Sequence, residues 1–402
     1  MNVTPVQDEQ QLEELLSRGV ADIIPREMVE KKLATGERMR VYLGVDPTGP
    51  SVHIGHAVIL RKLRALQDLG HEIIFLIGDF TARIGDPTGK DKMRVTLTHE
   101  DVLANAQTYK EQIAKVLRFD GDNPVSIKFN AEWLDALRFQ DVIELGAKFT
   151  VQQMLERDMF DNRMKEGRPI YVHEFFYPLM QGYDSVAMDV DGEVGGSDQL
   201  FNMLAGRTLL KEMKGKEKFV MTFELLEGLD GRKMSKSYNN IVGVTDEPND
   251  MFGKIMAVKD ELLPRYFELA TDVSMEKVAE VKNRMEGGEN PRDIKIELAK
   301  EIVGMYHNAE AADIAEQEFF KVFAEKERPT DIPEHELSAE EMGIVDVVAE
   351  VGFAQSKSEA RRLVQQGGVK LNDEKVEGID VMVRRGEEIL LQVGKRKFIT
   401  LK

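Results

Sequence analysis

The sequence predicts an α/β protein in which a parallel-sheet domain is followed by an α-helical domain and a small α+β domain. Three patterns favour this fold class. Buried-strand patterns at residues 39–45 and 72–77 flank a helical pattern within about 40 residues, which is typical of a βαβ unit and hence of parallel strands. Residues 248–325 have helical periodicity and no strand pattern. The last 65 or so residues combine short helices and strands around a Gly-Gly turn.

The first elements are bounded by residues that favour helix ends. Apolar positions at helical spacing predict a helix over 8–18 that stops at Gly19. A second helix is expected to begin at Pro25 and end at Gly36, because proline fits the first helical turn and glycine the residue after the last turn. The first strand of the βαβ unit follows directly.

The helix of the βαβ unit is expected to end at Gly70, just before the second strand. Thr98 to Asp101 fits a capping box that opens a long helix to about Leu117. The elements expected next are a strand over 125–129, mostly helix over 131–186, a helix from the glycine pair at 195–196 to about Met213, and a strand over 219–223. Residues 325–337 carry many charges and two prolines, which is typical of a linker.

Composition excludes several classes of protein. The 402 residues include 42% hydrophobic and 31% charged residues and no cysteine, which excludes disulfides, thiolate zinc sites and cysteine nucleophiles. The longest apolar run, Ile73 to Ile77, is too short to span a bilayer. The N-terminus lacks the basic start and apolar stretch of a secretory signal, so a cytoplasmic protein is expected.

Charge is distributed unevenly along the chain. The net charge is −18, yet residues 351–402 hold eleven basic and seven acidic residues. A polyanion such as RNA could therefore be attracted to the end of a protein whose body repels it. A small domain with mixed surface charge is an equally good interpretation of this count alone.

Three familiar motifs are not supported. Residues 85–90 resemble a Walker A loop, but the spacing is one residue short and Asp91 replaces the required Ser or Thr. No G-x-G-x-x-G opens the βαβ unit. His53 and His56 could share a helix face and bind zinc, but no third ligand is evident nearby, so no zinc site is expected.

Two short motifs point instead to phosphate chemistry. His53-Ile-Gly55-His56 follows the first strand at the start of a helix, where parallel sheets bind ligands and helix N-termini favour phosphate. Two surface histidines would be the simpler interpretation of this motif alone. About 180 residues later, Lys233-Met-Ser-Lys236-Ser237 places two lysines on a loop, which suits a pyrophosphate whose charge grows during phosphoryl transfer.

This pair of motifs resembles the HIGH and KMSKS signatures of class I aminoacyl-tRNA synthetases, and the chain is similar to the bacterial-type tyrosyl-tRNA synthetases over essentially its full length. The supporting segments are those around Tyr42–Thr48, Phe80–Lys90, Tyr177–Asp184 and Gly195–Gln199, with a final segment, Ser356–Lys370, that resembles a small-ribosomal-subunit RNA-binding domain. One departure is Leu200-Phe201-Asn202, where another branch of the family has Trp-Gly-Asn.

The resemblance implies a division of the chain. A Rossmann-like catalytic domain would span 1–228, with a helical insertion at about 130–186. The KMSKS loop and an α-helical anticodon-binding domain would span 229–324, a linker 325–338, and the RNA-binding domain 339–402.

The resemblance also assigns the amino-acid site. Tyr42 and Asp184 would bind the phenol hydroxyl of tyrosine, and Gln199 would lie near its carboxylate. The group that would bind or adjoin the α-ammonium is Asp86, Tyr177, Gln181 and Thr81. Tyr177, Gln181 and Asp184 are spaced i, i+4, i+7, so they share one helix face, as lining one pocket requires.

For ATP, the resemblance implies contacts from the HIGH and KMSKS motifs and from two carboxylates. The expected ATP-binding residues are Asp46, His53, Gly55, His56, Asp198, Lys233, Lys236 and Ser237. Those expected to act in catalysis are Thr48, His53, His56, Lys90, Arg94, Lys233 and Lys236. None would be a covalent nucleophile, because the tyrosine carboxylate attacks the α-phosphorus and the protein positions the reactants.

The remaining expectations concern partners. Mg²⁺ would accompany ATP, held more by phosphates than by carboxylates. The tail would bind a tyrosine-accepting tRNA through Lys357, Arg361, Arg362 and Lys370. A homodimer is implied, and no membrane association. The alternatives are a non-catalytic RNA-binding relative, which would be expected to lack a signature residue, and a tryptophanyl enzyme, which would not need the Tyr42/Asp184 pair.

Overall fold

The computed structural model describes residues 3–47, 51–87, 99–235, 238–321, 332–354, 356–386, 388–394 and 397–402. The chain divides into two compact units, residues 1–312 and 313–402, and each is considered by itself. Among the described residues, no helix combines the length and apolar character needed to cross a membrane.

The first unit is built around a sheet whose strand order is β1-β6-β5-β2-β3-β4. All neighbouring strands in it are parallel except β1, which pairs antiparallel with β6 at one edge. The strands are β1 (Val20–Ile24), β2 (Arg40–Val45), β3 (Glu72–Ile77), β4 (Ser126–Phe129), β5 (Gly192–Gly196) and β6 (Phe219–Phe223). The expected parallel sheet is therefore present, with one antiparallel edge strand that the sequence did not predict.

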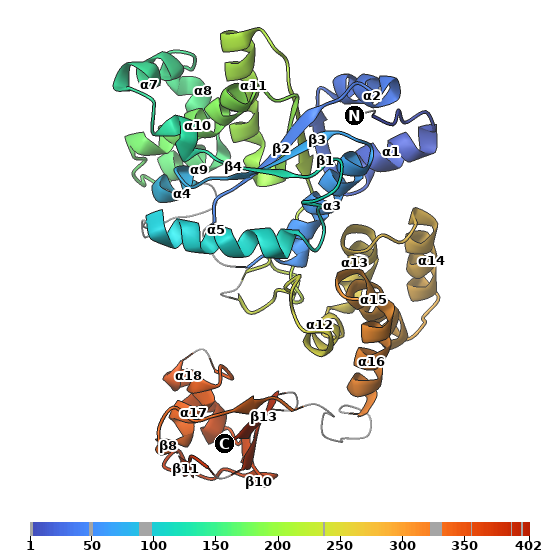
Figure 1. The fold of residues 1–402 in the computed structure, drawn as a ribbon, viewed down its shortest axis with the longest axis vertical. Coiled ribbons are helices and arrows are strands. Elements are labelled where there is room, and N and C mark those ends of the chain that lie inside the picture. Colours follow the sequence, from blue (N-terminus) through green and yellow to red (C-terminus); the bar gives the residue numbers. More distant parts are fainter. Residues whose placement is uncertain are drawn as a thin grey trace. The chain divides into compact units, whose positions relative to one another are not determined.

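Helices cover both faces of this sheet (Figure 1), with α10 and α11 on one side and α3 and α5 on the other. This double cover explains the continuous apolar run at Ile73–Ile77, in which each residue is at most 1% exposed. The helices are α1 (Glu9–Ser17), α2 (Arg26–Thr35), α3 (Ile54–Asp68), α4 (Thr81–Ile84), α5 (His99–Ile113), α6 (Ala131–Leu134), α7 (Phe139–Gly146), α8 (Val151–Leu155), α9 (Asp158–Lys165), α10 (Val172–Met188) and α11 (Leu200–Lys214).

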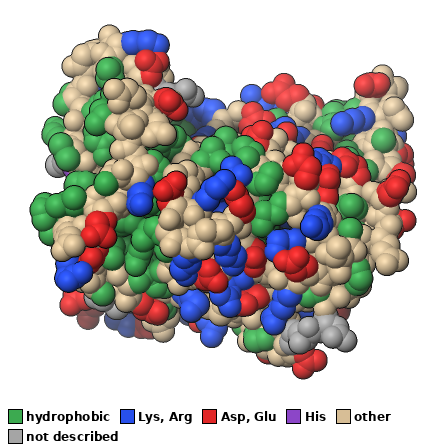
Figure 2. Space-filling view, turned by 90° about the horizontal axis from the view of Figure 1, so that it is seen from above, with side chains coloured by type: hydrophobic (Ala, Val, Ile, Leu, Met, Phe, Trp, Pro, Cys, Tyr) green, Lys and Arg blue, Asp and Glu red, His purple; other side chains and the backbone are tan. Residues whose placement is uncertain are grey.

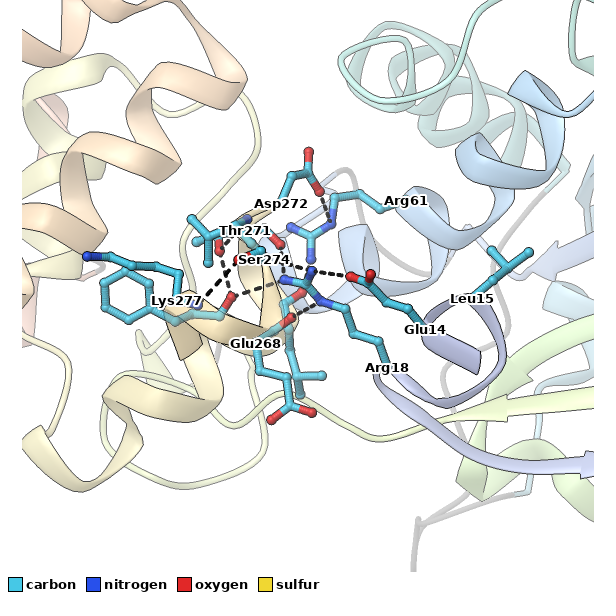
Figure 3. Close-up of polar contacts among 12 residues, drawn as sticks. Glu14, Leu15, Arg18, Arg61, Glu268, Thr271, Asp272, Ser274 and Lys277 are labelled. Atoms are coloured by element: carbon cyan, nitrogen blue, oxygen red, sulfur yellow. Dashed lines mark hydrogen bonds and ion pairs between the residues drawn. The ribbon is translucent and has the colours of Figure 1, made fainter. Parts of the chain in front are cut away.

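A helical region follows the sheet, as the sequence predicts. It contains α12 (Pro248–Ile255), α13 (Leu263–Ala270), α14 (Met275–Glu286), α15 (Pro291–Tyr306) and α16 (Ala309–Phe320), and the boundary between the two units falls within α16. Arg18, just after α1, joins this region to the sheet by donating to backbone carbonyls at the end of α13 (Figure 3), including Glu268 O at 2.8 Å and Thr271 O at 2.8 Å.

The second unit is a small α+β domain, as the sequence predicts. Its elements are β7 (Glu334–His335), β8 (Glu341–Gly343), α17 (Ile344–Glu350), α18 (Lys357–Gln365), β9 (Val369–Leu371), β10 (Glu374–Lys375), β11 (Met382–Arg384), β12 (Ile389–Val393) and β13 (Lys397–Leu401). β7 pairs with β13, and Leu337 is buried in the core of the unit. The end of the segment expected to be a linker is therefore part of the folded unit.

Candidate active site

A cleft of about 340 Å³ opens where β2, β3 and β5 end, at the start of α3. This is the edge at which parallel α/β sheets bind their ligands. Every expected tyrosine or ATP contact that the structure describes lines this cleft: Tyr42, Asp46, His53, Gly55, His56, Thr81, Asp86, Tyr177, Gln181, Asp184, Asp198, Gln199 and Lys233. The other five, Thr48, Lys90, Arg94, Lys236 and Ser237, lie outside the described residues.

The histidine motif forms the first turn of α3. His53 is the N-cap, and its backbone N–H donates to His56 Nδ1 at 3.3 Å. The two rings stack with their centroids 3.7 Å apart. His56 has exposed surface in the cleft. Partial loss of water around the ring, followed by the positive charge of Lys233, lowers the pKa of His56 to about 4. The ring is therefore neutral at pH 7, and because Nδ1 accepts, Nε2 carries the proton and is a donor.

The loop that carries Lys233 lies directly against this turn. A Cβ built on Gly55 would be 3.0 Å from Met234 Sδ, so a side chain at this position would crowd the loop. The chain after the loop also contacts the turn, because Ile54 N donates to Val242 O at 2.9 Å. Lys233 Nζ lies 3.1 Å from Asp198 Oδ2. Two motifs that are 180 residues apart in sequence thus face the same cleft.

Asp46, at the end of β2, connects the two halves of the cleft. Its Oδ1 accepts from Thr81 Oγ at 2.7 Å and its Oδ2 from Tyr177 Oη at 2.9 Å. A Cβ on Gly78 would lie 2.1 Å from Asp46 Oδ1, so this contact requires glycine at the end of β3. The resemblance assigned Asp46 to ATP, whereas its partners Thr81 and Tyr177 were assigned to tyrosine.

Asp184 is buried at the inner end of the cleft. It accepts from Trp133 Nε1 at 2.7 Å and from Asn130 Nδ2 at 3.3 Å. Burial raises the pKa of the Asp184 carboxyl well above its ordinary value, and these two hydrogen bonds oppose the rise. Tyr42 is fully buried nearby, with its Oη 3.0 Å from Ser185 Oγ. Burial, followed by the Glu193 charge, raises the Tyr42 pKa well above its usual value, so its hydroxyl stays protonated.

Side chains that hydrogen-bond to one another line the rest of the amino-acid side of the cleft. Gln199 Nε2 donates to Asp86 Oδ2 at 2.8 Å, and Gln181 Nε2 donates to Glu193 Oε1 at 2.9 Å. Arg157 is buried, with its Nη2 3.9 Å from Asp86 Oδ1. Among the residues that the structure describes here, carboxylates therefore outnumber cations, which suits an ammonium group.

Sequence reasoning missed several residues of this site. Asn130 and Trp133 follow the end of β4, and a polar residue just after a parallel strand was a usable signal. Lys218, in the core, contacts Glu193, which lines the cleft, and no sequence motif marks either residue.

The expected RNA-contacting side chains lie on the second unit. Lys357, Arg361 and Arg362 are exposed on α18, and Lys370 is exposed on β9. Lys357 Nζ lies 2.7 Å from Asp346 Oδ1. The helix begins at Ser356, whose hydroxyl accepts from Glu359 N at 3.2 Å, so an N-cap fixes the start of the basic helix.

Comparison with known proteins decides the family. Residues 34–324 match the class I tRNA synthetases for tryptophan and tyrosine, and residues 325–401 match the tyrosine–tRNA ligase SYY-like C-terminal domain. The tyrosine–tRNA ligase of Carboxydothermus hydrogenoformans is 50% identical over 411 residues, which cover 99% of each chain. This chain belongs to the tyrosyl-tRNA synthetases. The tyrosine–tRNA ligase of Moorella thermoacetica is 49% identical over 393 residues, which cover 96% of this chain and 94% of that protein.

Solved structures of tyrosyl-tRNA synthetases share the fold. A C-terminally truncated mitochondrial enzyme from Aspergillus nidulans has a TM-score of 0.65 at 25% identity, covering 78% of this chain and 94% of that chain. The Archaeoglobus fulgidus enzyme complexed with L-tyrosine has a TM-score of 0.61 at 23% identity, covering 76% and 99%, and supports the fold alone.

Proposed function

The chain belongs to the tyrosine–tRNA ligases, and we propose which of its residues carry out each step of the reaction. It activates L-tyrosine with ATP to tyrosyl-adenylate and pyrophosphate, then transfers tyrosine to the 3′-terminal adenosine of its tRNA. The observation that carries the route is the packing of the Lys233 loop on the first turn of α3, beside a pocket lined by carboxylates. This arrangement supports the route, because the Lys233 charge and two imidazole side chains lie next to carboxylates that could bind an ammonium group.

In this route the inner end of the cleft recognises the phenol. Tyr42 and Asp184 bind the substrate hydroxyl, one as donor and one as acceptor, since both are buried at this end. Phenylalanine would leave these polar groups unpaired, which is unfavourable away from water. Asp86, Tyr177 and Gln181 hold the α-ammonium, Thr81 supports them, and Gln199 lies near the carboxylate.

ATP occupies the other end of the cleft. Asp198 binds the ribose, Gly55 leaves room for the nucleotide, and the His53 and His56 rings donate to phosphate oxygens. Lys233 neutralises the departing pyrophosphate together with Lys90, Arg94 and Lys236, and Thr48 and Ser237 contact ATP. These other five residues lie outside the described part of the chain. The tyrosine carboxylate is the nucleophile, so the chain supplies orientation and charge stabilisation.

Mg²⁺ is proposed to arrive with ATP. Among the described residues, no three or more carboxylate or histidine side chains form a cluster that could hold a metal. Asp46 already accepts from Thr81 and Tyr177, and Asp198 contacts Lys233. Phosphate and water oxygens therefore remain as the main ligands, as Mg²⁺ commonly prefers.

ATP–pyrophosphate exchange with tyrosine, phenylalanine and tryptophan, measured side by side, tests this route. We expect exchange that depends on tyrosine and is far weaker with the other two. In Tyr42→Phe, kcat/KM for tyrosine should fall about 10-fold, because one buried hydrogen bond to the substrate is lost. Exchange supported equally by tryptophan, or by no amino acid, would refute the proposal.

We also propose that two copies pair through the face formed by α7–α10. This face exposes large apolar side chains, which Figure 2 shows gathered on the left, the side where Figure 1 places these helices. They are Phe139 (80% exposed), Ile143 (56%), Val151 (66%), Met164 (55%), Val172 (69%) and Phe176 (39%). Several large apolar side chains exposed on one set of helices are typical of a protein–protein interface, and α10 carries the predicted tyrosine contacts as well.

Light scattering after gel filtration tests the pairing. The parent chain should have twice the mass of one 45.5 kDa chain, and Ile143→Glu should shift it toward the monomer because the substitution buries a charge in the interface. Met275→Glu, at an exposed apolar position on α14, is the matched control. A monomeric parent chain would contradict the dimer without affecting the route in the cleft.

The second unit and the helical region are proposed to hold the tRNA. Lys357, Arg361, Arg362 and Lys370 would contact phosphates, because RNA helices are recognised largely through shape and backbone. The helices α12–α16 would read the anticodon. Charging takes place where ATP, tyrosine and tRNA are all present, so we propose the cytoplasm as the site of action.

A further inference from the structure

Lys218, which immediately precedes β6, is a charged residue with no solvent-exposed surface. Its Nζ donates to Ser185 Oγ at 2.6 Å and forms an ion pair with Glu193 Oε2. It also lies 5.6 Å from the centroid of the Tyr42 ring. Lysine is rarely buried completely, and its charge must then be paired, so a lysine in this position needs an explanation.

Sheet register places two neighbours of Lys218, Tyr42 and Glu193, side by side in the lining of the cleft. Tyr42 on β2 and Glu193 on β5 are register neighbours on adjacent parallel strands, so their side chains point to the same face of the sheet. That face is covered by α10, which carries Gln181 and Ser185. Glu193 Oε1 accepts from Gln181, and Ser185 Oγ lies 3.0 Å from Tyr42 Oη. Lys218 thus reaches two predicted tyrosine contacts, each through one intermediate side chain.

Two glycines make this network possible by letting α10 and α11 approach closely. A Cβ on Gly206 of α11 would lie 2.7 Å from Lys218 Nζ and 2.8 Å from Ser185 Oγ. A Cβ on Gly182 of α10 would lie 2.8 Å from Leu209 Cδ1. A larger residue at position 206 would occupy the space in which Lys218 and Ser185 meet.

The donor and acceptor inventory shows what the network does. An ammonium group only donates, so Ser185 Oγ accepts from Lys218 and its own proton remains available for another acceptor. Tyr42 Oη lies 3.0 Å from Ser185 Oγ and can accept this proton. The same ammonium balances Glu193, which would otherwise be an unpaired carboxylate beside Tyr42 and Asp184, and this keeps Glu193 in place for Gln181.

We propose that Lys218, Glu193 and Ser185 form a positioning network that fixes the Tyr42 hydroxyl and the Gln181 amide, and that this network sets the preference for tyrosine over phenylalanine. The inference rests on the proposed phenol pocket and deepens it. None of the three residues needs to touch the substrate, because each acts through Tyr42 or Gln181.

The test uses variants that remove the network without leaving an unpaired charge. They are Ser185→Ala, Gly206→Ala and the double variant Lys218→Met/Glu193→Gln. In pyrophosphate exchange, each should raise KM for tyrosine about 10-fold and lower the tyrosine-to-phenylalanine ratio of kcat/KM about 10-fold, while KM for ATP changes less than about 2-fold. Lys216→Met is the matched control, since Lys216 pairs with Asp189 and Asp191 near the surface.

Tyr42→Phe separates failure of this inference from failure of the proposed pocket. If Tyr42→Phe lowers the tyrosine-to-phenylalanine ratio while all three network variants keep the parent ratio, the network does not position the pocket and the inference is wrong. If Tyr42→Phe also leaves the ratio unchanged, the phenol pocket itself is wrong. If the double variant does not fold, the tyrosine-to-phenylalanine ratio of Ser185→Ala tests the inference, because this substitution removes only one hydroxyl.

Discussion

At the scale of single residues, Asp184 and Trp133 connect recognition with a measurable signal. Trp133 is the one tryptophan in the sequence, and its Nε1 donates to Asp184 Oδ1 at 2.7 Å. A ligand that bonds to Asp184 must change the electrostatic environment of this indole. Tryptophan fluorescence therefore reports directly on occupation of the phenol pocket.

His71 predicts how stability depends on pH. It is fully buried, its Nδ1 accepts from Met39 N at 3.2 Å, and burial lowers its pKa to about 4. The unfolded chain takes up this proton near pH 6.5 and the folded chain only near pH 4, so stability is lost as pH falls between these values. At pH 5 the loss from this residue should be about 2 kcal/mol.

Urea unfolding at pH 7 and pH 5, followed by Trp133 fluorescence, measures this loss. In His71→Asn, whose amide oxygen can replace the Nδ1 acceptor, the difference between the two pH values should shrink by about 2 kcal/mol. His173→Asn, at an exposed position, is the control. An unchanged difference in His71→Asn would show that the pKa of His71 is not lowered in the folded chain.

The sequence predicts the place of a site residue when the pattern that marks it lies within one helix or strand. Tyr177, Gln181 and Asp184 were predicted to share one helix face, and all three line the cleft from α10. Lys218 could not be predicted, because its partners come from β2, β5 and α10 and only the fold brings them together. The periodicity of one helix is visible in sequence, whereas the meeting of four elements is not.

At the scale of elements, Arg18 supplies hydrogen bonds to the carbonyl groups at the end of α13, a helix about 250 residues later in the sequence (Figure 3). Its guanidinium donates to Glu268 O, Thr271 O and Val273 O at 2.7–2.8 Å and contacts Glu14 Oε1 at 3.2 Å. The last carbonyls of a helix have no partners within the helix, and a cation is favourable at this end.

Arg18→Ala should destabilise the first unit by about 3 kcal/mol, because several charge-assisted hydrogen bonds are lost and carbonyls remain unpaired. Hydrogen exchange should accelerate selectively in the amides of α13. Arg26→Ala removes a more exposed arginine that pairs with Glu13 and Glu30, and it should cost less than about 1 kcal/mol. Equal effects of the two substitutions would show that the α13 contacts of Arg18 contribute little.

Two elements escaped prediction for physical reasons. β5 contains three glycines, which have low strand propensity, and a Cβ on Gly192 would lie 2.1 Å from the Phe219 ring. This segment therefore forms a strand because it packs against the neighbouring strand, and its own sequence does not indicate one. β1 is a five-residue edge strand that pairs with β6 about 200 residues later, and it carries a register shift between Val20 and Asp22. Long, periodic elements such as α3 and α10 were predicted because their pattern repeats over several turns.

At the scale of the whole molecule, we expect the two units to take different parts in the reaction. The cleft lies within residues 1–312, and the candidate RNA contacts of α18 and β9 lie within 313–402. Deleting residues 322–402 should leave tyrosine-dependent exchange within about 2-fold of the full chain and lower kcat/KM for tRNA charging by at least about 10-fold, because phosphate contacts are lost. An equal loss in both reactions would mean that the second unit supports the fold of the first.

The most direct test of the whole account separates binding of tyrosine from its activation in Lys233→Ala. Trp133 fluorescence gives the affinity for tyrosine, and a rapid-quench experiment gives the rate of adenylate formation. We expect the rate to fall about 100-fold with tyrosine affinity within about 2-fold, because the charge that Lys233 stabilises develops only in the transition state. Weaker tyrosine binding with an unchanged rate would contradict the account.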